Sequence, residues 1–422
     1  MKETDRASNR GLHYGWIVVA VSAVAVLGAL GFARFGYTMI MPSMKQGLGL
    51  SDSQAGDLAT SSMIGYLALA IVSGLLASRF GPRIIITIFM LVTSLGMLFT
   101  GLAPSFSYAL LTCMLMGFGS AGSNVPVMGL VSAWFSPRRR GLASGIVVSG
   151  SSFGLLITGI LIPAVLRRYV DSGWRYSWIV LAALTLVIAL LCWVFLRNRP
   201  SDRGAVPVGS EGDGESPGVA KSATLDWRLV YKSPSIWVLG GIYVLFGFSY
   251  IIYATFFARY LIGEAGFTIE SAGALWSTVG ALSIVSGFIW GSVSDLVGRK
   301  YGLAIVFFLQ ALCYIVFGVW NALPGYYVSA MLFAFTAWSI PAIVAATAGD
   351  LVGARLAPAA LGFITLFFGV GQAAGPFIAG RIAQGTGSYT LAFVIAGIAA
   401  GLGGIACIVA LPAKQSRYKV SR

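Results

Sequence analysis

Residues 74–83 read Gly-Leu-Leu-Ala-Ser-Arg-Phe-Gly-Pro-Arg, and residues 291–300 read Gly-Ser-Val-Ser-Asp-Leu-Val-Gly-Arg-Lys. Each stretch is a short polar turn between two long apolar runs, and the second follows the first at an offset of 217 residues. Further matches at the same offset join Gly56 with Gly273, Arg138 with Arg355, Gly145 with Gly362 and Gly154 with Gly371. We interpret this pattern as an internal duplication, in which both copies of a helical unit have the same orientation.

About a dozen apolar stretches fill most of the chain, and each is long enough to cross a bilayer. Hydrophobic residues make up 57% of the 422 residues, and charged residues only 10%. A soluble domain could not bury so much apolar surface, whereas a bilayer removes the need to bury it. The sequence predicts an all-α membrane protein with twelve transmembrane helices, near residues 14–42, 53–78, 84–102, 107–134, 141–166, 174–196, 235–262, 270–294, 301–322, 326–348, 359–383 and 389–411.

Residues 199–232 interrupt this pattern of apolar stretches. They begin with Pro200, Ser201 and Asp202 and continue as a run rich in Gly, Ser and Glu, which is too polar to span a membrane and is typical of a flexible linker. The sequence therefore predicts two pseudo-symmetric six-helix bundles, in residues 1–198 and 233–422, joined by a cytoplasmic linker in residues 199–232.

The distribution of positive charge predicts the orientation of the chain. Of the 28 Lys and Arg residues, 21 lie in segments that would share one side of the membrane, and six lie in segments that would share the other. Cytoplasmic loops carry this excess of Lys and Arg, so we expect both termini in the cytoplasm. The net charge of +14 thus reports topology, and we expect a multi-pass protein of the inner membrane without a nucleic-acid partner.

The sequence shows no pattern typical of an enzyme, a metal site or a cofactor site. The four cysteines all fall inside apolar stretches, without metal-ligand or disulfide spacing. We find no phosphate-binding loop that would indicate ATP use, and no nucleophile with a base at a useful spacing. We therefore expect neither catalysis nor a cofactor.

The paired turns resemble the loop signature of the major facilitator superfamily, Gly-x-x-x-Asp-Arg-x-Gly-Arg-Arg. The second copy has Asp295 at the acidic position of this signature, whereas the first copy has Ser78. The resemblance covers nearly the whole chain and implies two six-helix bundles that rock around a central site. It also implies that ion pairs at the basic turns hold the cytoplasmic gate closed, from the set Arg79, Arg83, Arg138, Asp295, Arg299, Lys300 and Arg355.

Two finer resemblances concern branches of the superfamily. Residues 134–145, Trp-Phe-Ser-Pro-Arg-Arg-Arg-Gly-Leu-Ala-Ser-Gly, are similar to the helix 4–5 junction of monocarboxylate transporter-like and oxalate/formate antiporter-like members. The eighth predicted helix lacks the arginine that several of those transporters use to bind substrate, and the first lacks their acidic-glycine-aromatic opening. Residues 33–37, Ala-Arg-Phe-Gly-Tyr, followed by Pro42, Gly56 and Tyr66, are similar to a bacterial facilitator branch.

Arg34 is the candidate residue for binding an anion. It is the one cation flanked by long apolar runs on both sides, and a cation near a helix centre costs about 2.5–3.5 kcal/mol on insertion scales. We expect it to face the central cavity and bind a carboxylate through its bidentate fork. Two alternatives remain open, namely an ion pair with Asp57 on the second helix and an extended conformation that reaches the outer surface.

Other candidates for the substrate site rest on the family geometry, in which helices 1, 4, 7 and 10 line the cavity. They are Tyr37, Asn124, Tyr250, Tyr253 and Trp338. Gln372 joins them because an amide in the membrane needs a partner or water. Packing between helices is the alternative role for each aromatic residue.

The chain has few acids that could carry a proton. None of its fourteen acids lies at the centre of a predicted helix, and Asp57 is the best placed of them for proton coupling. Glu270 or the carboxylate of the substrate are alternatives, and so is a purely structural role for Asp57 near a helix N-terminus.

A membrane-embedded cation without a mid-membrane acid favours an anionic ligand over a cationic one. Taken with the resemblance, this predicts a monomeric secondary transporter of a small organic anion, of the monocarboxylate type, driven by proton symport. Antiport of two organic acids is an alternative mode, and an exporter of hydrophobic drugs or metabolites by proton antiport is an alternative function. A membrane sensor is disfavoured because the chain carries no soluble signalling domain.

Overall fold

The computed structural model describes residues 13–210, 228–353 and 356–412. Helices make up nearly all of these residues, and no strand occurs in them beyond an isolated bridge between Phe135 and Val208. The first half contains α1 (Tyr14–Val26), the π-helix η1 (Leu27–Phe35), α2 (Gly36–Leu48), α3 (Asp52–Phe80), α4 (Pro82–Gly101), α5 (Phe106–Trp134), α6 (Pro137–Arg168), α7 (Gly173–Phe195) and the 3₁₀-helix η2 (Pro200–Arg203). The second half contains α8 (Arg228–Tyr231), α9 (Pro234–Gly263), α10 (Ile269–Ser283), α11 (Ser286–Val297), α12 (Arg299–Val319), α13 (Leu323–Thr336), α14 (Ser339–Val352), α15 (Ala357–Thr386) and α16 (Thr390–Ala410).

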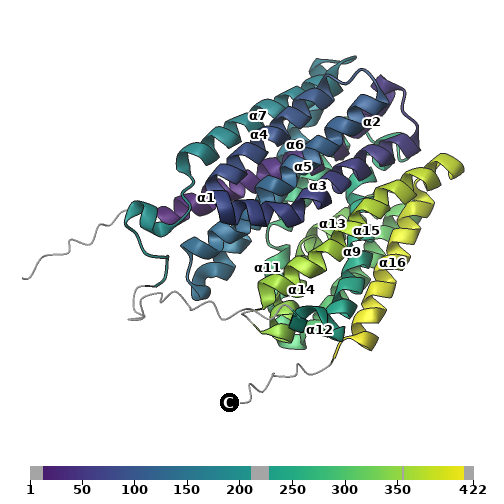
Figure 1. Ribbon diagram of the computed structural model, residues 1–422. Helices are drawn as coiled ribbons and strands as arrows, with labels where there is room; N and C mark the ends of the chain where they lie inside the picture. The colour runs from purple at the N-terminus through teal and green to yellow at the C-terminus, as the bar shows by residue number, and fades with distance from the viewer. Residues whose placement is uncertain (1–12, 211–227, 354–355, 413–422) are drawn as a thin grey trace, which may run out of the picture.

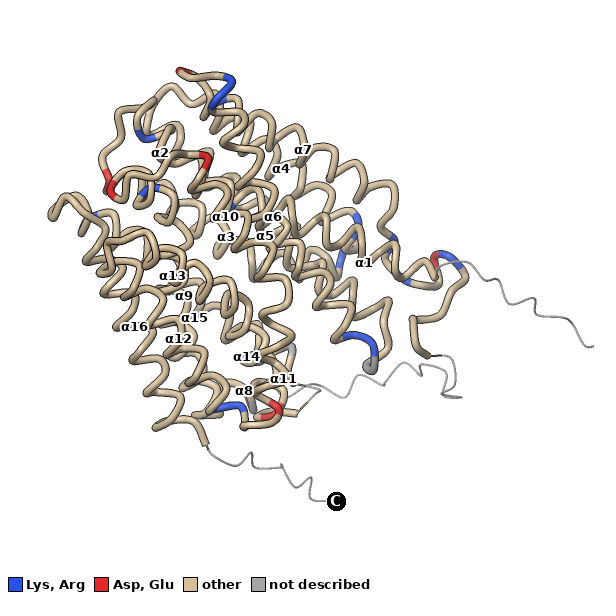
Figure 2. The backbone as a smooth tube through the Cα atoms, turned by 180° about the vertical axis from the view of Figure 1, so that it is seen from behind, with Lys and Arg blue, Asp and Glu red and all other residues tan. Residues whose placement is uncertain are grey.

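The described helices can account for the twelve predicted spans. Ten of them, counting α1–η1–α2 as one and α13–α14 as another, are long and apolar enough to cross a membrane. The bent helix α3 and the bent pair α10–α11 bring the number to twelve. Charged residues gather near the two ends of the molecule, as expected where helix ends meet water (Figure 2). The prediction of an all-α multi-pass membrane protein is therefore confirmed.

Three predicted helices depart from regular α-helix in their interior. The first is wound as a π-helix over η1, which is a rare form that often marks functional sites. The span predicted at 270–294 bends by 44° between α10 and α11. The span predicted at 326–348 breaks at Ala337 and Trp338, between α13 and α14. The sequence predicted these spans but not their interior breaks. Pro341 was a usable signal for the last one, because a proline has no N–H to donate to the Ala337 carbonyl four residues before it.

Two groups of helices pack mainly within themselves. Helices α1–α7 form one group and α9–α16 form the other, and Figure 1 shows the purple-to-teal helices on one side and the green-to-yellow helices on the other. The main contacts between the groups join α3 with α15, α6 with α10 and α2 with α9. We call the first group the N-bundle and the second the C-bundle.

The two bundles pack closely toward one side of the molecule. We call the side where α1 begins and α16 ends the terminal side, and the opposite side the distal side. Toward the distal side, a Cβ on Gly56 would lie 2.3 Å from the Pro376 carbonyl oxygen, and one on Gly159 would lie 2.4 Å from that of Gly273. Such contacts require glycine, so the backbones of α3 and α15, and of α6 and α10, touch here.

Toward the terminal side, the same helices lose this contact. A Cβ at Gly74, Gly145, Gly291 or Gly362 would have no other atom within 4 Å. Every hydrogen bond and ion pair found between the bundles, among the described residues, lies at the distal side or at mid-height. The bundles are therefore closed on the distal side and open toward the terminal side.

The start of the predicted linker is ordered against the N-bundle. Val208 is buried, and its backbone N–H donates to the Trp134 carbonyl, while its carbonyl accepts from the Ser136 N–H. Residues 199–210 are therefore attached to the N-bundle through a buried valine, and the flexible linker stays a prediction. Residues 211–227 lie outside the described part of the chain, and the proposed division at 199–232 stays a prediction.

Replacing Gly154 by alanine should destabilise the protein. Its Cβ would lie 2.1 Å from the Cα of Gly31, where α6 crosses η1, and such overpacking costs about 1–3 kcal/mol. Gly145→Ala, on the same helix in open space, is the matched control and should be neutral or stabilising by up to about 1 kcal/mol. Thermal unfolding in detergent checks this, and equal melting temperatures for the two variants would contradict the packing described here.

Candidate functional site

Arg34 lies inside the first span, near the end of the π-helix η1. The segment carries Gly28 and Gly31, which let it pack closely against neighbouring helices, and a Cβ on Gly31 would lie 2.6 Å from the Cα of Gly154. The guanidinium is half-buried, so it is neither enclosed in the core nor spread on the surface. The first span therefore changes from α-helix to π-helix in the segment that carries Arg34, the one cation of this apolar run.

The groups around Arg34 are aromatic rings and hydroxyls. Its guanidinium carbon lies 5.3 Å from the centre of the Tyr66 ring, and it interacts electrostatically with the Tyr250 hydroxyl. No carboxylate lies within 4.0 Å of Arg34 among the described residues. The predicted alternative of an Arg34–Asp57 ion pair is therefore wrong for this structure, and a positive charge is left without a counter-ion.

Asn124 and Tyr66 extend this polar group on the N-bundle. The Asn124 side-chain amide donates to the Tyr66 hydroxyl at 2.9 Å, and both side chains are half-buried. Asn124 is on α5 and Tyr66 on α3, so two helices converge with η1 on one place. Sequence reasoning gave Tyr66 no role at the site, although its position in the first bundle next to polar and small residues was a usable signal.

Trp338 approaches the same place from the C-bundle. Its ring centre lies 5.9 Å from that of Phe35, the neighbour of Arg34, and 6.3 Å from that of Tyr250. Its indole N–H donates to the Ser152 hydroxyl on α6 at 2.7 Å. Arg34, Asn124, Tyr250 and Trp338, with Tyr66, therefore form one cluster between the bundles, which we call the Arg34 site.

Tyr253 and Tyr37 make their hydrogen bonds outside the Arg34 site. Tyr253 is fully buried inside the C-bundle, where its hydroxyl bonds with that of Ser329, so its shared face with Tyr250 does not bring it to the site. Tyr37 is buried and donates to the Ala55 carbonyl at 2.7 Å. Together with Arg34, Tyr37 lines a cavity of about 10 Å³, room for roughly one water.

Gln372 is buried on α15, one helical turn from Phe368. Phe368 stacks toward Tyr250, with ring centres 6.4 Å apart, and residues four apart share a helix face. The amide nitrogen of Gln372 has no hydrogen-bond partner among the described residues. A buried N–H without a partner is costly, so this group is available as a donor.

Asp57 is part of an ion pair between the bundles. Its carboxylate lies 2.8 Å from the Arg381 guanidinium of α15, on the distal side. Both side chains are partly exposed, at 25% for Asp57 and 45% for Arg381. The predicted proton-coupling candidate therefore bridges the two bundles, and its partner comes from the other half of the sequence.

Asp52 forms a second link between the bundles on the distal side. It lies 2.6 Å from Lys45 of the N-bundle and 3.5 Å from Arg259 of the C-bundle. The Tyr389 hydroxyl, also from the C-bundle, donates to it at 2.9 Å. Burial and the neighbouring carboxylate of Asp52 raise the pKa of Tyr389, so its hydroxyl is protonated and can donate. These contacts and Asp57–Arg381 together form the distal gate.

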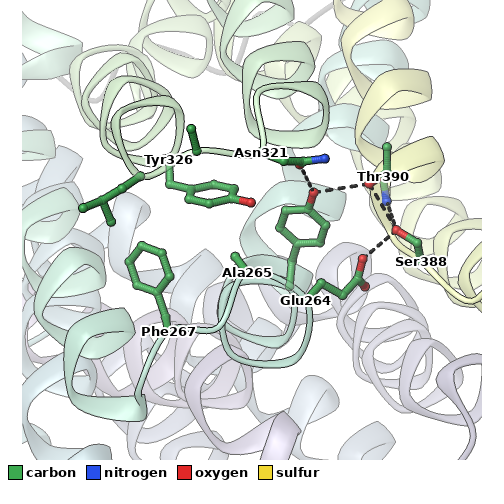
Figure 3. Close-up of a pocket in the computed structure, with 10 residues that line it drawn as sticks. Glu264, Ala265, Phe267, Asn321, Tyr326, Ser388 and Thr390 are labelled. Carbon is green, nitrogen blue, oxygen red and sulfur yellow. Dashed lines mark hydrogen bonds between the residues drawn. The ribbon is translucent and has the colours of Figure 1, made fainter.

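A cavity of about 360 Å³ lies beside the distal gate, in the C-bundle. Figure 3 shows its polar wall, in which Tyr260 bonds with Asn321 and Thr390, and Ser388 donates to Glu264. Glu264 also accepts from the Tyr389 N–H at 3.1 Å, which fixes the tyrosine that reaches Asp52. The cavity contains none of the predicted substrate-binding residues, and its wall supports the gate.

The contacts described for the basic turns on the terminal side lie within one bundle. Arg299 lies 2.5 Å from Asp295 and 3.1 Å from Asp350, all in the C-bundle. Arg83 donates to the Trp193 carbonyl in the N-bundle, and Arg79 lies over the ring of Phe80. Arg355 and the side chain of Arg138 lie outside the described part of the chain. The predicted role of these residues in a terminal-side gate stays a prediction.

Two helical bundles that close on one side around a central polar cluster define a membrane transporter of the major facilitator type. The chain matches, over residues 26–408, the model of the family described as uncharacterised MFS-type transporter YbfB. The protein belongs to this family of the major facilitator superfamily, and it is a transporter rather than an enzyme.

Several relatives resemble the chain over most of its length. They include the probable sulfoacetate transporter SauU of Cupriavidus necator (26% identical, 90% of both chains), the hexuronate transporter of Bacillus subtilis (27%, covering 86% of this chain and 87% of the relative) and human monocarboxylate transporter 2 (23%, covering 91% and 82%). The fold is similar to that of a bacterial homologue of the human lysosomal transporter Spinster, in an inward-facing and unoccupied conformation, at 18% identity, with a TM-score of 0.72 and 94% and 96% of the chains covered.

Replacing Arg381 by glutamine should open the distal gate more often. A partly exposed ion pair contributes up to about 1 kcal/mol, which corresponds to a shift of up to roughly fivefold in the open population. In a Thr60→Cys background, whose residue lies between α3 and α15, a membrane-impermeant thiol reagent applied from the distal side should label the protein faster.

Arg168→Gln is the control for this labelling experiment, because Arg168 is exposed on the distal side and makes no ion pair among the described residues. The charge reversal Asp57→Arg with Arg381→Asp should restore slow labelling. Unchanged labelling of the Arg381→Gln variant would show that this pair does not hold the gate.

Proposed function

We propose that the protein is a secondary active transporter that moves a small organic anion across the cytoplasmic membrane. The observation that supports this most is the positive charge of Arg34, which lies between the bundles and has no carboxylate partner in the described part of the chain. Even a half-buried cation without a counter-ion is costly, and an anionic ligand lowers that cost by forming a charge-assisted, bidentate pair. The named substrates of the relatives, sulfoacetate, hexuronate and monocarboxylates, are all anions.

The neighbouring groups suit the head group of such an anion. Arg34 supplies the charge, and the hydroxyls of Tyr66 and Tyr250 and the amide of Asn124 supply further hydrogen-bond donors nearby. The ring of Trp338 and the stacked rings of Phe368 and Tyr250 provide flat walls. One cation among aromatic walls favours a monoanion, and we propose a monocarboxylate or a related acid as the substrate.

An exporter of hydrophobic drugs is the alternative function. It would be favoured if Arg34 were neutralised permanently by Asp57, which would leave an apolar cavity. Asp57 is instead paired with Arg381, so the positive charge near the cavity is retained. This observation favours the anion transporter.

Transport would proceed by alternating access between the two bundles. With the positive-inside orientation, the terminal side is cytoplasmic and this conformation faces inward. Substrate release inside would be followed by closure on the terminal side and opening of the distal gate. The gate must then separate Asp52 from Arg259 and Asp57 from Arg381.

Proton symport would use an acid of the distal gate. Asp57 is our candidate, because protonating its carboxylate removes the charge that holds Arg381 of the other bundle. An external proton would thereby favour the outward-facing state that also receives the anion. We expect a monomer, since each chain contains a complete site.

A thermal-shift screen of small acids tests the role of Arg34. Pyruvate, sulfoacetate and glucuronate represent three anion classes, and at least one should raise the melting temperature of the wild type. A buried arginine–carboxylate pair is worth about 3–5 kcal/mol when one partner is removed, so Arg34→Ala should weaken binding by at least about a hundredfold.

Arg168→Ala, at the exposed distal surface, is the matched control and should bind like the wild type. Counterflow of the labelled acid in proteoliposomes then distinguishes transport from binding alone. An acid that stabilises Arg34→Ala as strongly as the wild type would remove Arg34 from the site, and a transported hydrophobic drug that competes with no acid would support the alternative function.

A further inference from the structure

The contact between the bundles along α6 ends at a single polar cluster. From the distal side inward, Gly159 packs on Gly273, and Ser277 donates to the Leu156 carbonyl. The last hydrogen bond between α6 and the C-bundle, among the described residues, is at Ser152, and a Cβ on Gly145, two turns further, would meet no atom within 4 Å. Ser152 thus lies where the closed part of the interface between α6 and the C-bundle changes to the open part.

The hydroxyl of Ser152 binds both broken helices of the C-bundle. It accepts a hydrogen bond from the Trp338 indole N–H at 2.7 Å and another from the Ser283 hydroxyl at 2.9 Å. Ser283 is the last residue of α10, and Trp338 is the residue before α14. Ser152 is itself completely buried, so these bonds have no competition from water.

The two breaks are also bonded to each other. The Trp338 backbone N–H donates to the Ser286 hydroxyl, and the Ser339 hydroxyl donates to the Ser286 carbonyl. Beyond the breaks, α11 packs against α14, and Arg299 joins the ends of both through Asp295 and Asp350. The half-helices α11 and α14 are therefore tied together at both ends, and they can bend as one unit about Ser283–Ser286 and Ala337–Ser339.

Trp338 also belongs to the Arg34 site. Its ring contacts Phe35 and Tyr250, which are the neighbours of Arg34 in sequence and in space, respectively. An anion bound at Arg34 would displace the Trp338 ring. Any displacement of this ring changes the hydrogen bond between its indole N–H and the Ser152 hydroxyl. The same side chain is thus in contact with the site, with the N-bundle and with the bend point.

We propose that Ser152, through its hydrogen bond to Trp338, is the positioning residue that couples anion binding at Arg34 to the bending of α11 and α14. Occupation of the site shifts the indole, the bond to Ser152 rearranges, and α11 and α14 swing together to close the terminal side. This inference rests on the proposed anion site, but it concerns the conformational step and not the affinity. It predicts that the bond affects turnover more than binding.

The test is a double-mutant cycle in proteoliposomes with pyruvate, sulfoacetate and glucuronate as substrates. Trp338→Phe keeps a ring beside Phe35 and Tyr250 but removes the N–H, and Ser152→Ala removes the hydroxyl. Each should lower kcat by about three- to tenfold, the range of one buried hydrogen bond, with KM changed less than about twofold. The double variant should be no slower than the slower single variant, because both changes remove the same bond.

Two control variants keep the result interpretable. Ser249→Ala removes a buried hydroxyl whose hydrogen bonds to described residues all lie within α9, and it should leave kcat unchanged. Ser152→Thr keeps a hydroxyl and should recover at least part of the lost kcat. If Ser152→Ala does not fold, Trp338→Phe against Ser152→Thr still provides the comparison.

The outcomes separate this inference from the proposed function. Loss of kcat that adds up in the double variant, or a rise in KM with normal kcat, would overturn the coupling role while leaving Arg34 as the site. Normal kcat for Trp338→Phe would overturn it as well. If none of the three acids binds or is transported by the wild type, the proposed function fails first, and the labelling of Thr60→Cys in the Trp338→Phe background then tests the bend without substrate.

Discussion

A helix that crosses a membrane must satisfy its own backbone hydrogen bonds, because no water is present to do so. Among the described residues, three departures from the regular α-helix lie around Arg34. The π-helix η1 carries Arg34, and the breaks at Ile284–Val285 and Ala337–Trp338 meet at Ser286. Irregular backbone is tolerated in a membrane where protein or a water-filled cavity covers it. The irregular segments therefore need the covered position between the bundles, and the site there needs the shape that these segments give it.

Close packing decides on which side the cavity opens. Glycine pairs such as Gly159 and Gly273 bring backbones into contact on the distal side, and the ion pairs of the distal gate lie beyond them. In a membrane the hydrophobic effect does not hold two apolar helices together, so van der Waals contact and polar links must do so. The terminal side has neither among the described residues, and the bundles therefore diverge there. The distal side is thus closed because these contacts between the bundles are made there. In another conformation of the transporter, contacts on the terminal side would replace them.

Local sequence patterns predicted the elements but not their partners. The apolar runs placed nearly all the spans, and an isolated charge in one of them identified Arg34, because insertion of a cation is costly wherever the helix packs. The partner of Asp57 could not be found in this way, since Arg381 is 324 residues away in the sequence. The similar predicted depth of the two residues in the membrane suggested Arg34 as the partner of Asp57. The actual partner is Arg381, because α3 packs against α15. The roles of Tyr66 and Ser152 likewise depend on helices that meet only in the fold.

The duplication explains the overall symmetry but not the chemistry, because the bundles contribute different groups. The N-bundle brings the charge and the amide, through Arg34 and Asn124. The C-bundle brings aromatic rings and the two broken helices, through Tyr250 and Trp338. An anion between the bundles would be attracted by the charge of the N-bundle and would contact the aromatic rings of the C-bundle. Binding energy from the charge can then act on the bundle that has the bend points, and this division of tasks couples the site to the movement.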